Sequence, residues 1–258
     1  MVGDVVERCQ TGIVGYDLIS QGGFVRNSSN VFVGGPGSGK TTFLLEFLYN
    51  GVTKYGENGL FCSFEPDILD TLNDAFAHGW DFYKLAEEGK IKFIKFSPET
   101  SIDELKNELT RLISQNDIKR ICFDPVSVLA LNISERGKIR ERVFDLVSLM
   151  KRLRVTSILS DESMESEGMD GFREGEWTKT DIIRFLSDSV SVLYTNGLTG
   201  DADRAIKIEK MRRTNHVRKL IGMRITDNGI EVLSPPGQAS IVQAQPAPAR
   251  QPAPAQAR

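Results

Sequence analysis

Apolar and polar residues follow two different periods between residues 30 and 160. Short apolar runs rich in β-branched and aromatic residues predict strands, and segments with apolar residues at helical spacing predict helices between them. The expected strands cover residues 30–34, 60–64, 91–96, 120–124 and 156–160. The expected helices cover residues 39–55, 66–77, 101–114 and 136–153. This alternation is typical of an α/β fold, with a mostly parallel central sheet flanked by helices on both faces.

The pattern changes after residue 188, where four apolar runs follow one another with only turns between them. They predict strands at residues 189–194, 205–211, 219–225 and 230–233. The sequence Asp227-Asn228-Gly229 between the last two runs is a strong signal for a hairpin turn. We therefore expect an antiparallel extension after the parallel core, with residues 1–233 forming one domain.

Residues 234–258 differ in composition from everything before them. They contain six of the ten prolines, many Ala and Gln, and only two charged residues, Arg250 and Arg258. Such a segment has too little apolar surface to offset the entropy of ordering it. We expect a disordered, partly polyproline tail, with a role in docking as the alternative.

Charge and cysteine content narrow the range of partners and compartments. The formal net charge is −3, and no long basic run occurs, which disfavours nucleic acid as the main partner. No window approaches 18 consecutive apolar residues, so no membrane span is expected. The three cysteines form no CxxC pair, and the first ten residues lack the apolar stretch of a signal peptide. These features predict a cytoplasmic protein.

The strongest chemical signal is a glycine-rich loop between an expected strand and an expected helix. It matches G-x-x-x-x-G-K-[ST] from Gly34 to Thr41. Glycines let consecutive backbone N–H groups turn inward around anionic oxygens, and the helix start directs its positive dipole end at the same charge. The motif predicts a phosphate cradle for ATP, formed by Gly35, Pro36, Gly37, Ser38, Gly39, Lys40, Thr41 and Thr42.

Two side chains of this loop and one carboxylate predict a site for ATP with Mg²⁺. Lys40 can reach the β- and γ-phosphates, and the hydroxyl of Thr41 can bind Mg²⁺. Asp124 ends an apolar strand, where ligands of open α/β sheets bind, so we expect it to be the acidic group at the metal. A helix cap or a turn former is the alternative reading of an Asp at this place.

Hydrolysis also needs a group that orients or deprotonates the attacking water. Glu65 follows the second expected strand, which puts its carboxylate at the same edge of the sheet. We expect Glu65 to be catalytic, with an N-cap before Pro66 as the alternative.

Three segments in this order resemble the KaiC-like branch of the RecA ATPase superfamily. They are residues 11–18 (Thr-Gly-Ile-Val-Gly-Tyr-Asp-Leu), the glycine-rich loop at 34–42, and residues 210–216 (Lys-Met-Arg-Arg-Thr-Asn-His). The resemblance covers about residues 11–233. It implies a RecA-like fold, with Lys40, Thr41, Asp124 and Glu65 in the roles given above.

The resemblance further implies a homo-oligomeric ring, typically a hexamer, with ATP between neighbouring subunits. In such rings the segment that corresponds to residues 210–216 is inserted against a neighbour's γ-phosphate. This implies catalytic roles for Lys210 and Arg212 and a nucleotide contact for His216. Cations supplied across an interface neutralise charge in the transition state. A solvated basic hairpin is the alternative.

Two prolines depart from the family pattern. Pro66 follows Glu65 where the family often has a second Glu, and Pro125 follows Asp124 where the family usually has Ser or Thr. The first change leaves one carboxylate for the water, and the second removes a hydroxyl near the metal. We therefore expect slow hydrolysis.

Three functions are compatible with these residues. The first is a ring ATPase whose nucleotide state controls assembly and the docking of an unidentified protein partner. The second is a RecA-like DNA-binding or repair ATPase, but residues 162–181 hold seven acidic residues against Arg173 and Lys179, and such a segment would repel phosphates. The third is a scaffold that senses ATP with little turnover, which Pro66 and Pro125 keep open.

Overall fold

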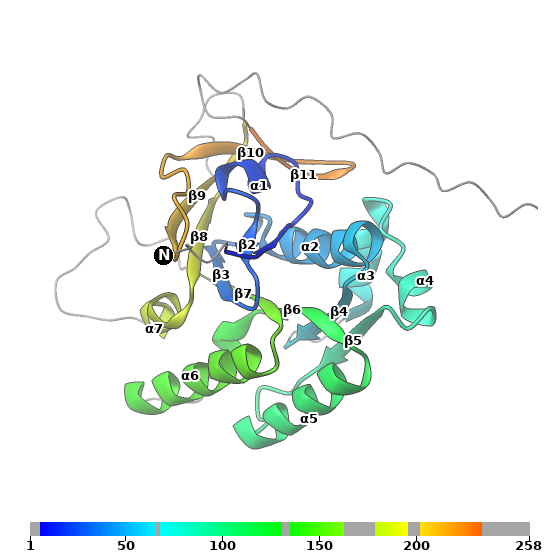
Figure 1. The fold of residues 1–258 in the computed structure, drawn as a ribbon, viewed down its shortest axis with the longest axis vertical. Helices are drawn as coiled ribbons and strands as arrows, with labels where there is room; N and C mark the ends of the chain where they lie inside the picture. The colour runs from blue at the N-terminus through cyan, green and yellow to red at the C-terminus, as the bar shows by residue number, and fades with distance from the viewer. Residues whose placement is uncertain (1–5, 65–67, 131–134, 163–178, 196–201, 234–258) are drawn as a thin grey trace, which may run out of the picture.

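The computed structural model describes residues 6–64, 68–130, 135–162, 179–195 and 202–233. These residues form one nine-stranded sheet in the order β11-β10-β9-β8-β3-β7-β6-β4-β5, and one two-stranded sheet (Figure 1). The strands of the large sheet are β3 (Ser29–Gly34), β4 (Asn58–Ser63), β5 (Ile91–Lys95), β6 (Ile118–Asp124), β7 (Thr156–Glu162), β8 (Ser189–Tyr194), β9 (Arg204–Met211), β10 (Ile221–Thr226) and β11 (Gly229–Val232). The small sheet pairs β1 (Arg8–Cys9) with β2 (Phe24–Val25).

Strands β3 to β8 are parallel to one another, and β9, β10 and β11 extend the sheet from β8 in antiparallel pairs. The described helices are α1 (Tyr16–Ile19), α2 (Lys40–Tyr55), α3 (Ile68–Ala77), α4 (Phe82–Glu87), α5 (Ile102–Gln115), α6 (Arg136–Arg152) and α7 (Lys179–Leu186), with a 3₁₀ turn at Val126–Ala130. None of these described helices is both long and apolar enough to cross a lipid bilayer.

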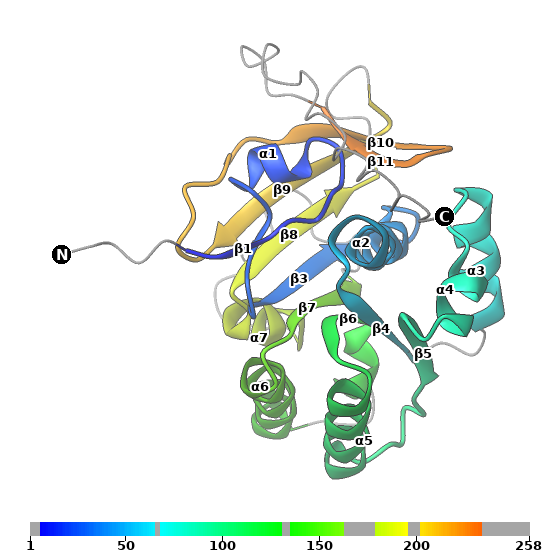
Figure 2. The same cartoon turned by 45° about the vertical axis from the view of Figure 1, so that its right-hand side comes forward.

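The helices cover both faces of the sheet, and each face has its own apolar core. Figure 2 shows α2, α3 and α4 on one side and α5, α6 and α7 on the other. Successive residues of β3 divide between the cores: Phe32 packs beneath α2, whereas Val31 and Val33 pack with α5 and α6. Because both faces are covered, the central parallel strands β3, β6, β7 and β8 are buried at nearly every position rather than at alternate ones.

The expected architecture is confirmed, including the antiparallel extension and the hairpin turn before Gly229. Each expected helix and strand has a counterpart whose ends differ by at most two residues. Helix α5 begins with a capping box, in which Ser101 Oγ accepts from the Glu104 backbone and the Glu104 carboxylate accepts from the Ser101 backbone. The helix expected from Pro66 begins at Ile68 in the described part of the chain, and Pro66 lies outside that part.

The short elements α1, α4, α7, β1 and β2 were not predicted from sequence. Helix α4 has 6 residues and is fixed by one local cap, in which Asp81 accepts the backbone N–H of Lys84. Such a helix is too short for its periodicity to be detected. The acidic segment 162–181 overlaps two elements at its ends, because Glu162 completes β7 and Lys179 begins α7. Residues 163–178 and the tail 234–258 lie outside the described residues.

A buried arginine joins α2 to the start of β6. Arg120 is 1% exposed, and its Nε lies 2.6 Å from a carboxylate oxygen of Glu57. It also donates to the carbonyl of Phe47 at 3.0 Å and stacks on the ring of that residue. A Cβ at Gly51 would come within 2.5 Å of the Arg120 side chain, so the helix provides this space by having no side chain there.

A buried glutamate joins α2 to the C-terminal hairpin. Glu46 is 4% exposed and accepts the backbone N–H of Ile230 in β11 at 2.7 Å. Burial raises the pKa of Glu46 to about 7, although the bond from Ile230 acts in the opposite direction. The carboxylate therefore changes its charge near neutral pH at a contact between the helix that follows the glycine-rich loop and the edge of the sheet.

This contact predicts a specific dependence of stability on pH. A carboxyl whose folded pKa is raised from 4.5 to about 7 stabilises the fold fully below the lower value and loses that contribution as pH rises through the higher one. Glu46→Gln stays neutral and can still accept from Ile230. The free energy of unfolding of Glu46→Gln relative to the wild type should therefore rise by up to about 3 kcal/mol between pH 5 and pH 8. Urea unfolding at several pH values measures this difference.

The matched control is Glu231→Gln, which neutralises a half-buried carboxylate on β11 itself. It should show no comparable trend with pH. A difference between Glu46→Gln and the wild type that stays constant from pH 5 to pH 8 would contradict the prediction.

Candidate functional site

Strand β3 places the glycine-rich loop in the middle of the large sheet. All six residues of β3 are buried, and the strand pairs with β7 on one side and β8 on the other. The chain then turns through residues 35–39 and enters α2 at Lys40. Gly37 and Gly39 have φ angles of 72° and 97°, a left-handed conformation that residues with a side chain rarely adopt. The loop conformation therefore depends on glycine at these two positions.

The other loop residues differ in their exposure. Pro36 and Gly37 form the exposed apex, Gly35 and Ser38 are buried, and Thr42 is half-buried in the first turn of α2. A Cβ at Gly34 would come within 2.5 Å of the Ser38 hydroxyl, so the loop folds back closely on the end of β3. The backbone is thus held compactly at the start of α2, as an anion-binding loop requires.

Lys40 lies over the loop that it belongs to. Its side chain is buried, and Nζ donates to the carbonyl oxygens of Gly34 at 2.8 Å and Gly35 at 3.1 Å. These two neutral acceptors keep a positive charge against the concave side of the loop. Phosphate oxygens, which are charged acceptors, form stronger hydrogen bonds with an ammonium group than carbonyl oxygens do.

Thr41 and Asp124 meet at the edge of the sheet. Strand β6 ends at Asp124, which is 7% exposed, and Thr41 Oγ1 donates to Asp124 Oδ2 at 2.7 Å. Hydroxyl and carboxylate oxygens are the ligands that Mg²⁺ prefers, and Mg²⁺ in nucleotide sites is usually held by one or two protein groups plus phosphates. The oxygen set at this place therefore fits Mg²⁺.

The structure adds Ser160, which the sequence analysis did not select. Its hydroxyl is fully buried in β7 and donates a hydrogen bond to Asp124 Oδ1. A signal was available, because Ser160 was the expected last residue of a strand in the same parallel sheet as Asp124. Because parallel strands end at one edge of the sheet, this position alone predicts that Ser160 lies near Asp124.

Arg204 is a second residue that the sequence analysis missed. Its Nε donates to the carbonyl oxygen of Gly37 at 2.9 Å, and its guanidinium also pairs with Asp203. Arg204 begins β9, which is far from the loop in sequence but pairs with β8 in the sheet. A cation therefore contacts the apex of the loop from within the same chain.

Lys210 and Arg212 lie at the opposite end of the sheet from the cradle. Met211 between them pairs with Ser189, which pairs with Asn30 near the start of β3, whereas the cradle follows the end of β3. At about 3.3 Å per residue the strand separates its two ends by roughly 17 Å. Neither side chain can therefore reach the phosphate cradle of its own chain.

The two cations differ in their contacts. Lys210 Nζ donates to three carbonyl oxygens at the end of α7, those of Arg184, Phe185 and Ser187, at 3.2, 3.1 and 2.6 Å. Burial, followed by repulsion from Arg212, lowers the pKa of Lys210. The Arg212 side chain is 53% exposed, and within the described part of the chain it forms a long ion pair of 3.7 Å with Asp188. Lys210 therefore fixes the end of α7, while Arg212 is accessible from outside.

The remaining expected site residues are His216 and Glu65. His216 is buried, its Nδ1 lies 3.1 Å from the carbonyl oxygen of Val217, and the Val217 backbone donates to Ile19. Like Arg212, it lies in the connection between β9 and β10. Glu65 lies outside the described residues, although Phe64 before it donates to the carbonyl oxygen of Asp124 at 3.0 Å.

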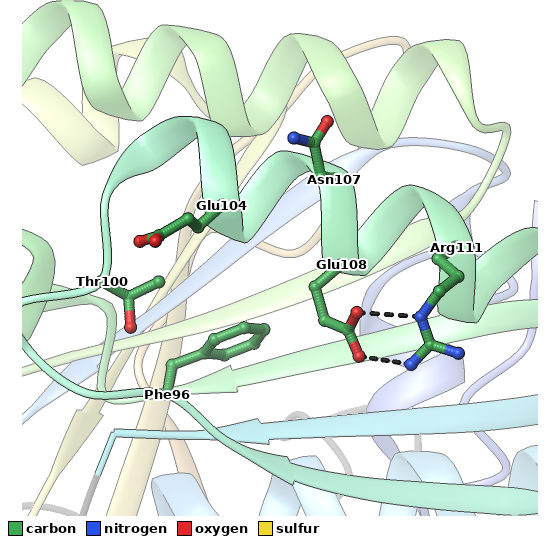
Figure 3. A pocket seen from close by; sticks show the side chains of 6 residues that line it. All are labelled: Phe96, Thr100, Glu104, Asn107, Glu108 and Arg111. Carbon is green, nitrogen blue, oxygen red and sulfur yellow. Dashed lines mark hydrogen bonds and ion pairs between the residues drawn. The ribbon is translucent and has the colours of Figure 1, made fainter.

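An open hollow of about 600 Å³ also lies beside α5 (Figure 3). It is lined by Phe96, Thr100, Glu104, Asn107, Glu108 and Arg111. Its charged groups are already engaged, because Arg111 pairs with Glu108 and Glu104 caps its own helix. The hollow shares no residue with the phosphate cradle, and it is a solvated helix face rather than a second candidate site.

Comparisons with known proteins agree with this geometry. The sequence profile of the KaiC ATPase family matches residues 9–237. The circadian clock oscillator proteins KaiC of Parathermosynechococcus lividus and Synechococcus elongatus are each 30% identical to the chain over 237 residues. The matches cover 88% of this chain but only 42% and 44% of those proteins, so the chain spans less than half the length of these curated relatives.

A solved structure gives the same result for the fold. The crystal structure of a KaiC-like protein from the hyperthermophilic archaeon Pyrococcus horikoshii superposes with a TM-score of 0.77 at 32% sequence identity. The match covers 89% of this chain and 100% of the archaeal one. The chain therefore belongs to the KaiC family of ATPases, within the RecA superfamily.

Proposed function

We propose that this chain binds ATP with Mg²⁺, hydrolyses it slowly, and does so as one subunit of a head-to-tail homo-oligomeric ring, a hexamer in the family pattern. The observation that carries the proposal is the meeting of Lys40, Thr41 and Asp124 at one edge of the sheet. Lys40 would exchange its two carbonyl acceptors for phosphate oxygens. Thr41 and Asp124 would hold Mg²⁺, which when bound neutralises charge on the phosphates.

Glu65 is proposed to orient and deprotonate the attacking water. A single carboxylate is sufficient for this role, because one acceptor can take the proton from the water. Pro66 leaves no second carboxylate next to it, which supports slow rather than fast turnover.

The ring is supported by the separation of the two halves of the site. The cradle and Arg212 lie at opposite ends of the sheet, so one chain cannot bring them together, whereas a head-to-tail contact between two chains can. We assign the finger that contacts the neighbour's γ-phosphate to Arg212. Lys210 is proposed to support it from within its own chain, because its ammonium group is already bound to three carbonyl oxygens.

Nucleotide state would then control assembly, because Arg212 would exchange its long ion pair with Asp188 for a γ-phosphate only when a neighbour holds ATP. A partner protein would dock on a ring that depends on this contact. The three cysteines, Cys9, Cys62 and Cys122, are all free and buried, which supports a reducing cytoplasmic compartment.

Lys40→Ala should weaken ATP binding at least about 100-fold. The substitution removes the ammonium group from the loop, and hydrogen bonds to charged groups each contribute about 1.5–3 kcal/mol. Isothermal titration with ATP and Mg²⁺ measures the loss. The control is Lys54→Ala, which removes a cation from the last turn of the same helix and should leave ATP affinity unchanged. Equal affinities for all three proteins would contradict the proposed site.

Glu65→Gln tests hydrolysis separately from binding. The amide cannot take a proton from water, so steady phosphate release should fall at least about 100-fold while ATP affinity stays within about threefold. Phosphate release and ATP titration are measured on the same preparations. A wild-type chain that binds ATP and releases no phosphate would instead favour a nucleotide-sensing scaffold.

Arg212→Ala should slow hydrolysis at least about 100-fold and leave ATP binding nearly intact, because fingers of this kind act on the transition state. Mixing Arg212→Ala with Lys40→Ala should restore part of the turnover, since an intact finger then faces an intact cradle. The control mixture replaces the second partner with Lys40→Ala/Arg212→Ala and should restore nothing. Equal rates in the two mixtures would argue against a finger supplied by a neighbour.

A further inference from the structure

The carboxylate of Asp124 is held at both of its oxygens by hydroxyl groups from two different elements. Thr41 at the start of α2 donates to Oδ2 at 2.7 Å, and Ser160 in β7 donates to Oδ1. Asp124 is 7% exposed and Ser160 is fully buried, so water does not compete effectively for these bonds. The carboxylate plane is therefore fixed before any nucleotide is bound.

Of the two hydroxyl groups, one can bind a cation directly and the other can act on it only through Asp124. Thr41 gives its proton to Asp124, which leaves the lone pairs of its oxygen available as a ligand. Ser160 approaches from the neighbouring strand on the other oxygen, and its proton likewise goes to the carboxylate. Ser160 thus acts on the metal site through Asp124.

The same strand contains a buried serine with a purely structural hydrogen bond. Ser157 Oγ donates to Ser29 Oγ at 2.9 Å near the amino end of β7, and both residues are buried. If the buried serines of β7 only formed structural hydrogen bonds like that of Ser157, Ser160 would also be expected to bond a neutral partner. Its acceptor is instead the carboxylate that ends β6 at the phosphate cradle.

We propose that Ser160 is a positioning residue that orients Asp124 for Mg²⁺, an inference that rests on the proposed function. It provides from β7 the hydroxyl that Pro125 does not provide beside Asp124. Outer-shell hydrogen bonds to a metal-binding carboxylate fix its orientation, and their loss typically lowers metal affinity 10–100-fold. Ser160 does not itself touch the nucleotide.

The test measures metal binding directly, with Mn²⁺ as the spectroscopic substitute for Mg²⁺. Mn²⁺ is titrated into full-length protein with excess non-hydrolysable ATP analogue, and free Mn²⁺ is followed by electron paramagnetic resonance. Ser160→Ala should weaken Mn²⁺ binding at least about 10-fold. Its affinity for the analogue in EDTA should remain within about twofold of the wild type.

Two further variants separate positioning from folding. Ser157→Ala removes an equally buried hydroxyl from the same strand and should leave Mn²⁺ affinity unchanged. Ser160→Thr keeps a hydroxyl and should bind Mn²⁺ within about threefold of the wild type. Urea unfolding of all variants checks that the losses of stability are comparable.

The outcomes distinguish this inference from the proposed function. A wild-type chain that binds neither the analogue nor Mn²⁺ would overturn both. A wild type that binds both, together with an unchanged Mn²⁺ affinity in Ser160→Ala, would overturn the role of Ser160 alone. Equal losses in Ser160→Ala and Ser157→Ala would also overturn it, because the effect would then follow from general destabilisation.

Discussion

The position of the phosphate cradle depends on the burial of β3 in the middle of the sheet. Its backbone is hydrogen-bonded on both sides, and its side chains alternate between two separate cores, with Phe32 in one and Val33 in the other. A shift of one residue would exchange these side chains between cores, which is strongly disfavoured. The end of β3 is therefore fixed relative to the ends of β6 and β7, and Lys40, Asp124 and Ser160 meet as a consequence.

Much of this arrangement could be predicted from sequence, because it follows from local patterns. Continuous apolar runs identify strands that are buried on both faces, and helical spacing identifies the layers that cover them. The motif from Gly34 to Thr41 predicts an anion-binding loop from residues that are adjacent in sequence. Asp124 could be placed because strands of a parallel sheet end at one edge. The residues that were predicted well thus depend on short-range signals or on one general rule of topology.

The features that were missed depend on pairs of residues distant in sequence. Ser160 joins Asp124 across 36 positions, Arg204 reaches Gly37 across 167, and Lys210 contacts the end of α7 across about 25. Sequence periodicity contains no information about such pairs. The resemblance to a family gave Lys210 and Arg212 similar roles, whereas their contacts separate a half-buried residue that fixes α7 from an exposed one whose ion pair with Asp188 is long.

The space at Gly51 has a consequence for how this sequence can vary. The guanidinium of Arg120 occupies the place where a side chain of α2 would otherwise lie, and its charge is balanced by Glu57. Enlarging position 51 alone would displace a buried cation from its carboxylate, and shortening position 120 alone would leave a void and remove one of the two arginines that pair with Glu57, the other being Arg26. We therefore expect positions 51, 57 and 120 to covary, so that homologues either keep Gly, Glu and Arg together or replace them together.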